Sequence, residues 1–189
     1  MYKRQVLDPS RKILLAVGRI REQKGFEKLL SAFSFFADKY PEWDLAIVGA
    51  GDPQELMRQA DTLGLGSRIF FTGQIGNMAD WYIAADIYVL SSLREGFPNS
   101  LAEAMAAGCP VVSFDCMTGP SDLITNEENG LLVELGNTMQ LSEAIQRVIV
   151  DEQLRSRLAN NAKRIRVSHS TKLINAKWQD LISSLVHDA

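Results

Sequence analysis

Residues Lys12 to Val48 read KILLAVGRIREQKGFEKLLSAFSFFADKYPEWDLAIV. Two short aliphatic runs, Lys12–Val17 and Leu45–Val48, flank the segment Phe26–Lys39, in which apolar residues recur three and four positions apart. Short apolar runs of this kind are typical of buried strands, and the three-to-four spacing is typical of an amphipathic helix. Because the helix is long enough to cross over a sheet, the two strands are expected to be parallel.

The alternation of strand and helix continues along the chain as far as Val133. The remaining strands are expected at Ile69–Phe71, Ile87–Leu90, Val111–Phe114 and Leu131–Val133, and the helices between them at Pro53–Leu63, Met78–Ala84 and Asn99–Ala107, with a short turn near Ser121–Thr125. Such alternation predicts an α/β domain of three layers, in which a Rossmann-like parallel sheet of six strands lies between two layers of helices.

The alternation stops with this last strand, and three helices are expected beyond it, at Thr138–Val150, Glu152–Val167 and Thr171–Val186. The last helix carries a broad apolar face, formed by Leu173, Ile174, Trp178, Leu181, Ile182 and Leu185. Such a face is expected either to pack on its own domain, which the residues alone favour, or to dock on a domain that the chain lacks.

These patterns divide the chain into three parts. Residues 1–11 are expected to be the remnant of an interdomain linker or an artificial start, residues 12–169 to form one globular domain, and residues 170–189 to form the C-terminal helix. A chain of 189 residues that is 46% hydrophobic is long enough to bury the core of one such domain.

Composition excludes several classes of protein. The 20 Lys and Arg residues against 23 Asp and Glu give a formal charge of −3, so we expect no general attraction to nucleic acid. No apolar run approaches the roughly 18 to 20 residues that cross a bilayer. Cys109 and Cys116 belong to no C-x-x-C pair and have no histidine nearby, so they are expected to be reduced thiols of a cytoplasmic protein.

Glycine-rich and polar segments follow five of the expected strands, at the edge where open parallel sheets bind their ligands. One of them, Gly49–Asp52, begins with G-x-G, but Gln54 stands where a dinucleotide fingerprint needs its third glycine. The chain also lacks the G-x-x-x-x-G-K-[ST] pattern of a Walker-type phosphate loop. Both observations disfavour these two modes of nucleotide binding.

Two pairs of charged residues stand out in these segments. Arg19 and Lys24 follow the first strand and are suited to hold a diphosphate, although two solvated surface cations would give the same pattern. Asn99 is expected to cap a helix whose first amides point at an anion. Glu95 and Glu103 are suited to accept paired hydroxyls of a sugar and a ribose, although Glu103 would also complement the helix dipole.

Short motifs around these residues occur in order from about Lys12 to Val133. They are Ala16–Arg19, Gln23–Phe26, Ile47–Gly51, Phe71–Gly73, Ala85–Ser92, Glu95–Pro98 and Glu103–Gly108. The most specific is E-x7-E, from Glu95 to Glu103, within EGFPNSLAEAMAAG. Together these motifs resemble family-4 glycosyltransferases, whose GT-B fold has two Rossmann-like halves. The resemblance covers only the C-terminal half of that fold.

The resemblance implies that residues 12–169 bind a nucleotide sugar. Arg19 and Lys24 would bind the donor diphosphate and Glu95 would contact hydroxyls of the donor sugar, so that these three carry the catalytic role. Glu103 would hold the ribose hydroxyls. Further donor contacts, largely through backbone groups, are implied at Gly18, Gly73, Ile75, Phe97, Pro98, Asn99, Ser100 and Leu101.

The resemblance also implies a reaction. A hexosyl group would pass from the nucleotide sugar to a glycan or lipid-linked acceptor, with retention of the anomeric configuration. A UDP-sugar is favoured as donor over a GDP- or ADP-sugar. The chain has no D-x-D motif, so neither a metal nor another cofactor is expected. The segment Asp115–Asp122 resembles a variant of bacterial transferases and favours polysaccharide or lipopolysaccharide biosynthesis.

Acceptor recognition belongs to the other half of a GT-B enzyme. The chain is therefore expected to be inactive alone and to meet its acceptor through a missing N-terminal domain. The full-length enzyme is expected in the cytoplasm, with peripheral association at the inner face of the membrane as a further hypothesis. Two alternatives stay open, namely a sugar-nucleotide-binding domain without catalysis and a related GT-B epimerase or phosphorylase.

Overall fold

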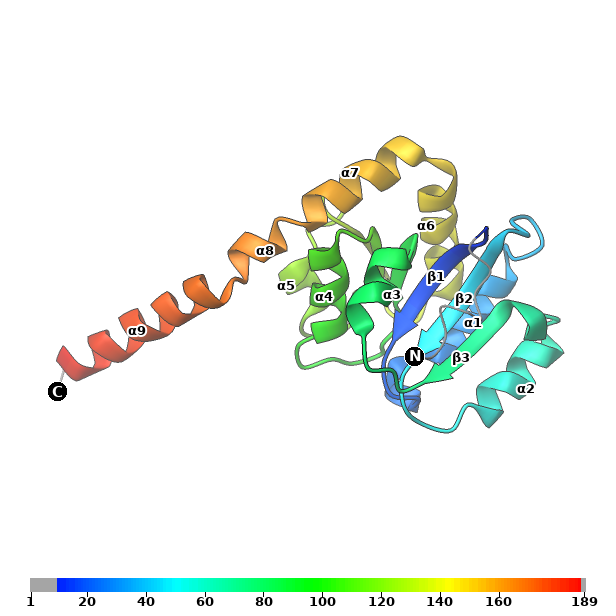
Figure 1. Cartoon of the computed structure of the whole chain (residues 1–189), viewed down its shortest axis with the longest axis horizontal. Helices are drawn as coiled ribbons and strands as arrows, with labels where there is room; N and C mark the ends of the chain where they lie inside the picture. Colours follow the sequence, from blue (N-terminus) through cyan, green and yellow to red (C-terminus); the bar gives the residue numbers. More distant parts are fainter. Residues whose placement is uncertain (1–9, 188–189) are drawn as a thin grey trace.

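The computed structural model describes residues 10–187, so the prediction for residues 1–11 falls mostly outside it. The strands are β1 (Lys12–Val17), β2 (Trp43–Val48), β3 (Ile69–Gly73), β4 (Ile87–Leu90), β5 (Val111–Phe114) and β6 (Leu131–Val133) (Figure 1). The helices are α1 (Phe26–Ser34), α2 (Gln54–Thr62), α3 (Met78–Ala84), α4 (Asn99–Ala107), α5 (Pro120–Leu123), α6 (Thr138–Val150), α7 (Glu152–Ala162), α8 (Ile165–Ser168) and α9 (Thr171–His187), with 3-10 turns η1 (Glu22–Lys24) and η2 (Gly66–Arg68).

The six strands form one sheet in the order β3-β2-β1-β4-β5-β6, and every neighbouring pair is parallel. The predicted Rossmann-like sheet is therefore confirmed. The chain builds outward from β1 to β3 and then crosses back to place β4 on the other side of β1. Ligands of such sheets bind at this reversal, outside the carboxyl ends of the strands. The strand order therefore identifies the loops after β1 and β4 as the expected ligand site.

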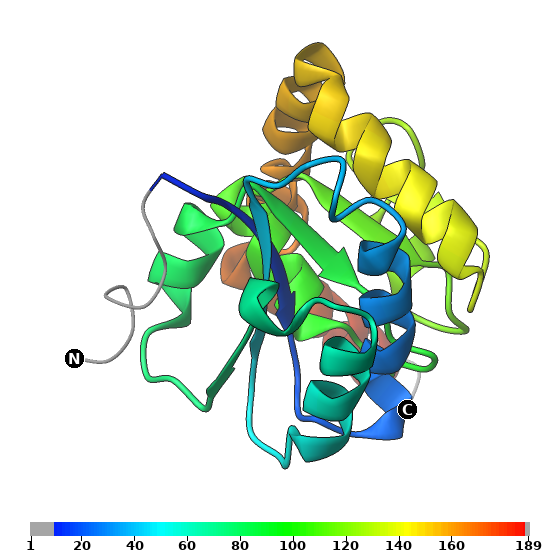
Figure 2. The ribbon, with the colours of Figure 1, turned by 90° about the vertical axis from the view of Figure 1, so that its right-hand side faces the viewer.

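Helices cover both faces of the sheet, and the alternation of side chains along each strand explains why. In β1, Leu14 and Ala16 join the core under α1, α2, α6 and α7, whereas Ile13 and Leu15 join the core under α3, α4, α5 and α8. Successive side chains of a strand point to opposite faces, so a strand between two layers must be apolar throughout. On the first face α1 and α6 lie side by side (Figure 2).

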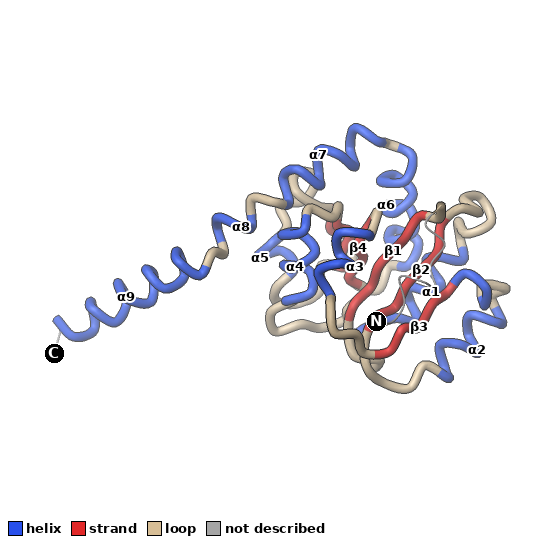
Figure 3. The backbone as a smooth tube through the Cα atoms, viewed as in Figure 1, coloured by secondary structure: helices blue, strands red, loops and turns tan. Residues whose placement is uncertain are grey.

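Two predicted helices are shorter or broken in the structure. The helix predicted over Phe26–Lys39 ends at Ser34. The Ser34 hydroxyl donates to Ser31 O (2.8 Å), and the amides of Phe36 and Ala37 both donate to Phe33 O, which turns the chain. The helix predicted over Glu152–Val167 divides into α7 and α8, because Arg164 and Val167 donate to carbonyls three residues back (Figure 3). Sequence periodicity does not register such local hydrogen bonds.

The last helix, α9, extends away from the domain (Figure 1). Its described side chains are exposed apart from the partly buried Ile174, and Trp178 and Leu185 expose 60% and 65% of their surface. The interpretation that this apolar face packs on its own domain is therefore wrong. Periodicity identified the helix and its apolar stripe, but it could not tell whether the stripe is covered. None of the described helices is long and apolar enough to span a membrane.

A chain that ends at His169 is expected to be as stable as the whole chain. The exposed face of α9 buries little apolar surface against the domain, so its removal should change the free energy of unfolding by less than about 0.5 kcal/mol. Chemical denaturation of the two chains would measure this difference. A loss of several kcal/mol would show that α9 folds back onto the domain in solution.

Candidate functional site

Two loops meet at the reversal of strand order, one after β1 and one after β4. Three hydrogen bonds that involve backbone groups join them. Leu93 N donates to Gln23 O (2.8 Å), the Gln23 side-chain amide donates to Arg94 O (2.7 Å), and the Ser91 hydroxyl donates to Lys24 O (2.9 Å). Each loop therefore fixes the backbone of the other before any ligand arrives.

Two of the predicted residues, Lys24 and Glu95, form an ion pair at this junction. Lys24 Nζ donates to Glu95 Oε1 over 2.6 Å, and the two side chains expose only 20% and 8% of their surface. Gly18 leaves room for the lysine, because a Cβ there would lie 3.0 Å from Lys24 Cδ and Cε. The sequence predicted each residue separately but not their contact. The pair presents a positioned ammonium group beside a carboxylate, which suits a ligand with both anionic and hydroxyl groups.

Gly25, next to Lys24, allows the two loops to approach. It adopts the left-handed conformation, with φ of 58°, where it ends η1 and starts α1. A Cβ on Gly25 would lie 2.2 Å from Ser91 O, well inside van der Waals contact with the backbone of the other loop. Glycine is therefore required here both for its conformation and for the close approach.

The N-terminus of α4 lies beside the pair, but its cap differs from the prediction. Asn99 is the first helical residue, and the N-cap is Pro98, without a side-chain cap. The Asn99 amide donates to Phe97 O and the Leu101 amide to Pro98 O. Among these three first-turn amides only that of Ser100 has no acceptor in the described structure. Proline in the cap position removes the expected capping role and leaves one amide for an anion.

Two buried tyrosines, which the sequence analysis did not select, support residues of α4. Tyr88 of β4 donates to Ser100 Oγ over 2.8 Å, and Tyr82 of α3 donates to Glu103 Oε2 over 2.8 Å. Their ring centroids lie 6.1 Å apart. Burial raises the pKa of both phenols well above the ordinary value, so both stay protonated and able to donate. A buried tyrosine usually needs a partner for its hydroxyl, which is the signal that could have found them.

A third segment, after β5, holds the Glu95 loop from the other side. The Thr118 hydroxyl lies within hydrogen-bonding distance of Glu95 O, and Thr118 adopts φ of 66°, which is uncommon outside glycine. Gly119 packs directly on Pro98, since a Cβ there would lie 2.5 Å from Pro98 Cδ. The loop that carries Glu95 is therefore held between the segments after β1 and β5.

The other predicted residues take different positions. Arg19 follows β1 with an exposed side chain, and it forms no ion pair in the described part of the chain. Gly73 ends β3, two strands from the reversal, whereas Ile75 packs against the core under α3 and α4. Phe97 is 47% exposed, and its ring centroid lies 6.3 Å from that of His169. Leu101 is fully buried, which leaves only its backbone for a ligand.

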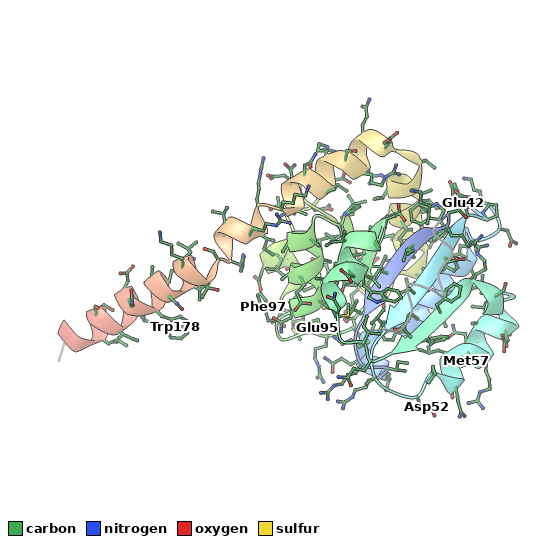
Figure 4. All side chains as sticks on the ribbon, viewed as in Figure 1. Glu42, Asp52, Met57, Glu95, Phe97 and Trp178 are labelled. Carbon is green, nitrogen blue, oxygen red and sulfur yellow. The ribbon has the colours of Figure 1, made fainter. Side chains whose placement is uncertain are left out.

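Figure 4 shows Glu95, Phe97 and Asp52 along the edge where strands end, with Glu42 at the opposite edge. A separate groove of about 610 Å³ lies between η1, α1 and α2, on the other face of the sheet from α4. Residues of both charges line it, among them Glu55 and Arg58, which pair with each other at 3.0 Å.

The described side chains of the whole structure form no cluster of His, Cys, Asp or Glu that could hold a metal ion.

The sheet and the junction define a class of protein. A parallel Rossmann-like sheet with a cation, two carboxylates and a helix N-terminus at its strand reversal is a domain suited to ligands that combine phosphate and hydroxyl groups. More narrowly, the chain belongs to the family described as glycosyl transferases group 1, whose sequence model matches residues 2–165. The fold matches the GT-B structures of that family.

Similar proteins support this membership over most of the chain. An uncharacterized glycosyltransferase of Haemophilus influenzae is 30% identical over 172 residues, which are 90% of this chain and 49% of that protein. The lipopolysaccharide core biosynthesis mannosyltransferase LpsB of Rhizobium meliloti is 30% identical over 93% of this chain and 54% of its own length. The chain thus spans about half the length of these curated relatives.

Solved structures of glycosyltransferases also resemble this chain over most of its length. The C-terminal domain of a group 1 glycosyl transferase, LpcC of Francisella tularensis, is 31% identical with a TM-score of 0.76, and the match covers 83% of this chain and 85% of that one. Anabaena HepE, solved in complex with UDP-glucose, is 26% identical with a TM-score of 0.84, and the match covers 92% of this chain and 49% of HepE.

Proposed function

We propose that this chain is the donor-binding half of a retaining family-4 glycosyltransferase, which transfers a hexosyl group from a nucleotide sugar to a glycan or lipid-linked acceptor. The observation that carries the proposal is the Lys24–Glu95 ion pair at the strand reversal, with Glu103 following on the adjoining helix. Cations suit a diphosphate, and carboxylates suit sugar hydroxyls. Acceptor binding falls to an N-terminal half, so the chain alone is expected to be inactive.

The similar proteins support a proposal for the donor and for the class of acceptor. HepE was solved with UDP-glucose, which favours a UDP-sugar over GDP- or ADP-sugars here. LpsB is named for lipopolysaccharide core biosynthesis, and AmsD of Erwinia amylovora, 29% identical, is named for amylovoran biosynthesis. We infer an acceptor of polysaccharide or lipopolysaccharide biosynthesis. A glycosyl donor with two phosphates also matches the positions of Arg19 and Lys24 near the end of β1.

The proposed chemistry uses charge stabilisation rather than a protein nucleophile. When the bond between the anomeric carbon and the diphosphate oxygen breaks, the electron pair stays on the diphosphate. Lys24, Arg19 and the Ser100 amide would stabilise that growing negative charge, while Glu95 holds hydroxyls of the sugar. Because Glu95 already pairs with Lys24, it positions the sugar and the cation together. The acceptor hydroxyl then adds to the anomeric carbon on the face that the diphosphate leaves and passes its proton to the departing diphosphate oxygen, which retains the configuration.

Attachment to the inner face of the membrane remains a separate hypothesis, as does a cytoplasmic location. One basic segment, around Lys163, Arg164 and Arg166, would suit anionic lipid, but it makes contacts within the domain. Arg164 pairs with Glu128 at 3.0 Å, and Arg166 Nε donates to Ala106 O over 2.5 Å. These contacts favour a structural role for the cluster over lipid binding.

Donor binding is expected to need no metal. If Arg19 and Lys24 supply the positive charge, the dissociation constant for UDP should be the same within about twofold in EDTA and in millimolar Mg²⁺. Calorimetric titration with UDP, GDP and ADP in both buffers would measure this and would identify the base. Binding that appears only with Mg²⁺ would contradict this account of the charge, and binding of none of the three would contradict the proposed function.

A further inference from the structure

Glu103 has a different environment from Glu95. Its side chain is exposed, and no cation pairs with it in the described part of the chain. The hydrogen bond from Tyr82 to Oε2 is the contact that the structure gives its carboxylate. The second oxygen, Oε1, accepts no hydrogen bond from the described residues. One carboxylate oxygen thus accepts a hydrogen bond from the protein, and the other is available to accept one from a ligand.

Tyr82 is much more rigidly placed than the glutamate it contacts. Its ring is only 4% exposed and belongs to the apolar core formed by α3, α4 and the sheet. The neighbouring Tyr88 ring, centred 6.1 Å away, is fully buried. A phenol fixed in this way holds its hydroxyl oxygen in one place. A glutamate on the surface of a helix would otherwise exchange among several rotamers.

We propose that Tyr82 is a positioning residue which, through Glu103, makes the site selective for ribonucleotides over nucleotides without ribose hydroxyls. This inference rests on the proposed function, in which Glu103 accepts the ribose hydroxyls. By occupying Oε2, Tyr82 leaves Oε1 and the remaining lone pairs of the carboxylate in a fixed place for the 2′- and 3′-hydroxyls. The rotamer entropy of the glutamate is then lost on folding rather than on binding.

Removing the phenol hydroxyl should loosen Glu103 without neutralising it. In Tyr82→Phe the aromatic ring still fills the core, and water replaces the phenol at Oε2, so the charge of the carboxylate is kept and only its position is lost. Affinity for UDP should therefore fall roughly three- to tenfold, the scale of ordering one glutamate side chain. Affinity for 2′,3′-dideoxy-UDP should not change, because that ligand offers nothing for Glu103 to bind.

The experiment is calorimetric titration of the whole chain with UDP and 2′,3′-dideoxy-UDP, or with the corresponding pair if GDP or ADP binds instead. Wild type should favour the ribonucleotide, Tyr82→Phe should reduce that ratio, and Glu103→Ala should abolish it. In the double variant Tyr82→Phe/Glu103→Ala, loss of the phenol should have no further effect, because Tyr82 acts only through Glu103.

Tyr88→Phe is the matched control. It removes another buried phenol hydroxyl from the same core, one that supports Ser100 at the helix N-terminus, so it should change the affinities for both nucleotides equally and leave their ratio intact. A Tyr82→Phe ratio equal to that of wild type would overturn the inference while the proposed function stands. If no nucleotide binds to the wild-type chain, the proposed function fails and this inference fails with it.

Discussion

Replacing Gly25 by alanine is expected to lower the free energy of unfolding by about 3 to 4 kcal/mol and to weaken nucleotide binding at the same time. The left-handed backbone at Gly25 costs a residue with a Cβ about 1 to 2 kcal/mol. The new Cβ would also lie 2.2 Å from Ser91 O, so the loops after β1 and β4 must move apart. That movement would break the Ser91–Lys24 hydrogen bond and displace the Lys24 ammonium group.

The variant Gly64→Ala separates the cost of the left-handed backbone from the cost of the close contact with Ser91 O. Gly64 also has a positive φ, of 70°, but a Cβ there would meet nothing within 4 Å. Its replacement should therefore cost only the conformational part, about 1 to 2 kcal/mol, and should leave nucleotide affinity unchanged. Chemical denaturation of the two variants measures the difference. Equal losses would show that the contact between Gly25 and Ser91 is not tight in solution.

Replacing Lys24 by alanine is expected to reduce affinity for the nucleoside diphosphate about 100-fold. The variant loses a charged hydrogen bond to the diphosphate, worth about 1.5 to 3 kcal/mol. It also leaves Glu95, which is 8% exposed, as an unpaired carboxylate next to the ligand's phosphates. At 25 °C each factor of ten corresponds to about 1.4 kcal/mol, so the first loss alone accounts for most of the change. Calorimetric titration measures the affinity.

Two further variants test the cause of that loss. Lys28→Ala removes a cation one turn further along, in α1, and should leave the affinity unchanged within about twofold. Adding Glu95→Gln to Lys24→Ala removes the unpaired negative charge and should recover part of the lost affinity, although the donor-sugar contact is weakened. If Lys24→Ala binds as tightly as wild type, Lys24 does not contact the diphosphate.

The strand–helix rhythm of the sequence predicts the sheet well because strands between two helical layers must be apolar on both sides. Every predicted strand exists, and β1, β4, β5 and β6 have the predicted bounds. Helix ends are predicted less well. After Ser34 the amides of Phe36 and Ala37 both donate to Phe33 O, a local hydrogen-bond pattern that periodicity does not register. Periodicity also does not tell whether an apolar helix face is covered, and the described side chains of α9 are exposed apart from the partly buried Ile174.

Lys24, Glu95 and Glu103 were predicted as site residues, and the structure pairs the first two. The supports of the site, Tyr82, Tyr88 and Thr118, were missed. Their roles arise from contacts across 12 to 23 positions of sequence, which no local spacing reveals. Arg19, by contrast, was predicted together with Lys24, but its side chain is exposed and forms no ion pair in the described part of the chain.

The central claim is that the junction of the loops after β1 and β4 binds a nucleoside diphosphate. Chemical-shift mapping of the backbone amides during titration with UDP, GDP and ADP tests both the binding and its place. The account predicts that one nucleotide shifts the amides of Gly18, Lys24 and Ser100. Shifts confined to the groove between α1 and α2, around Glu55 and Arg58, or no shifts with any of the three nucleotides, would contradict it.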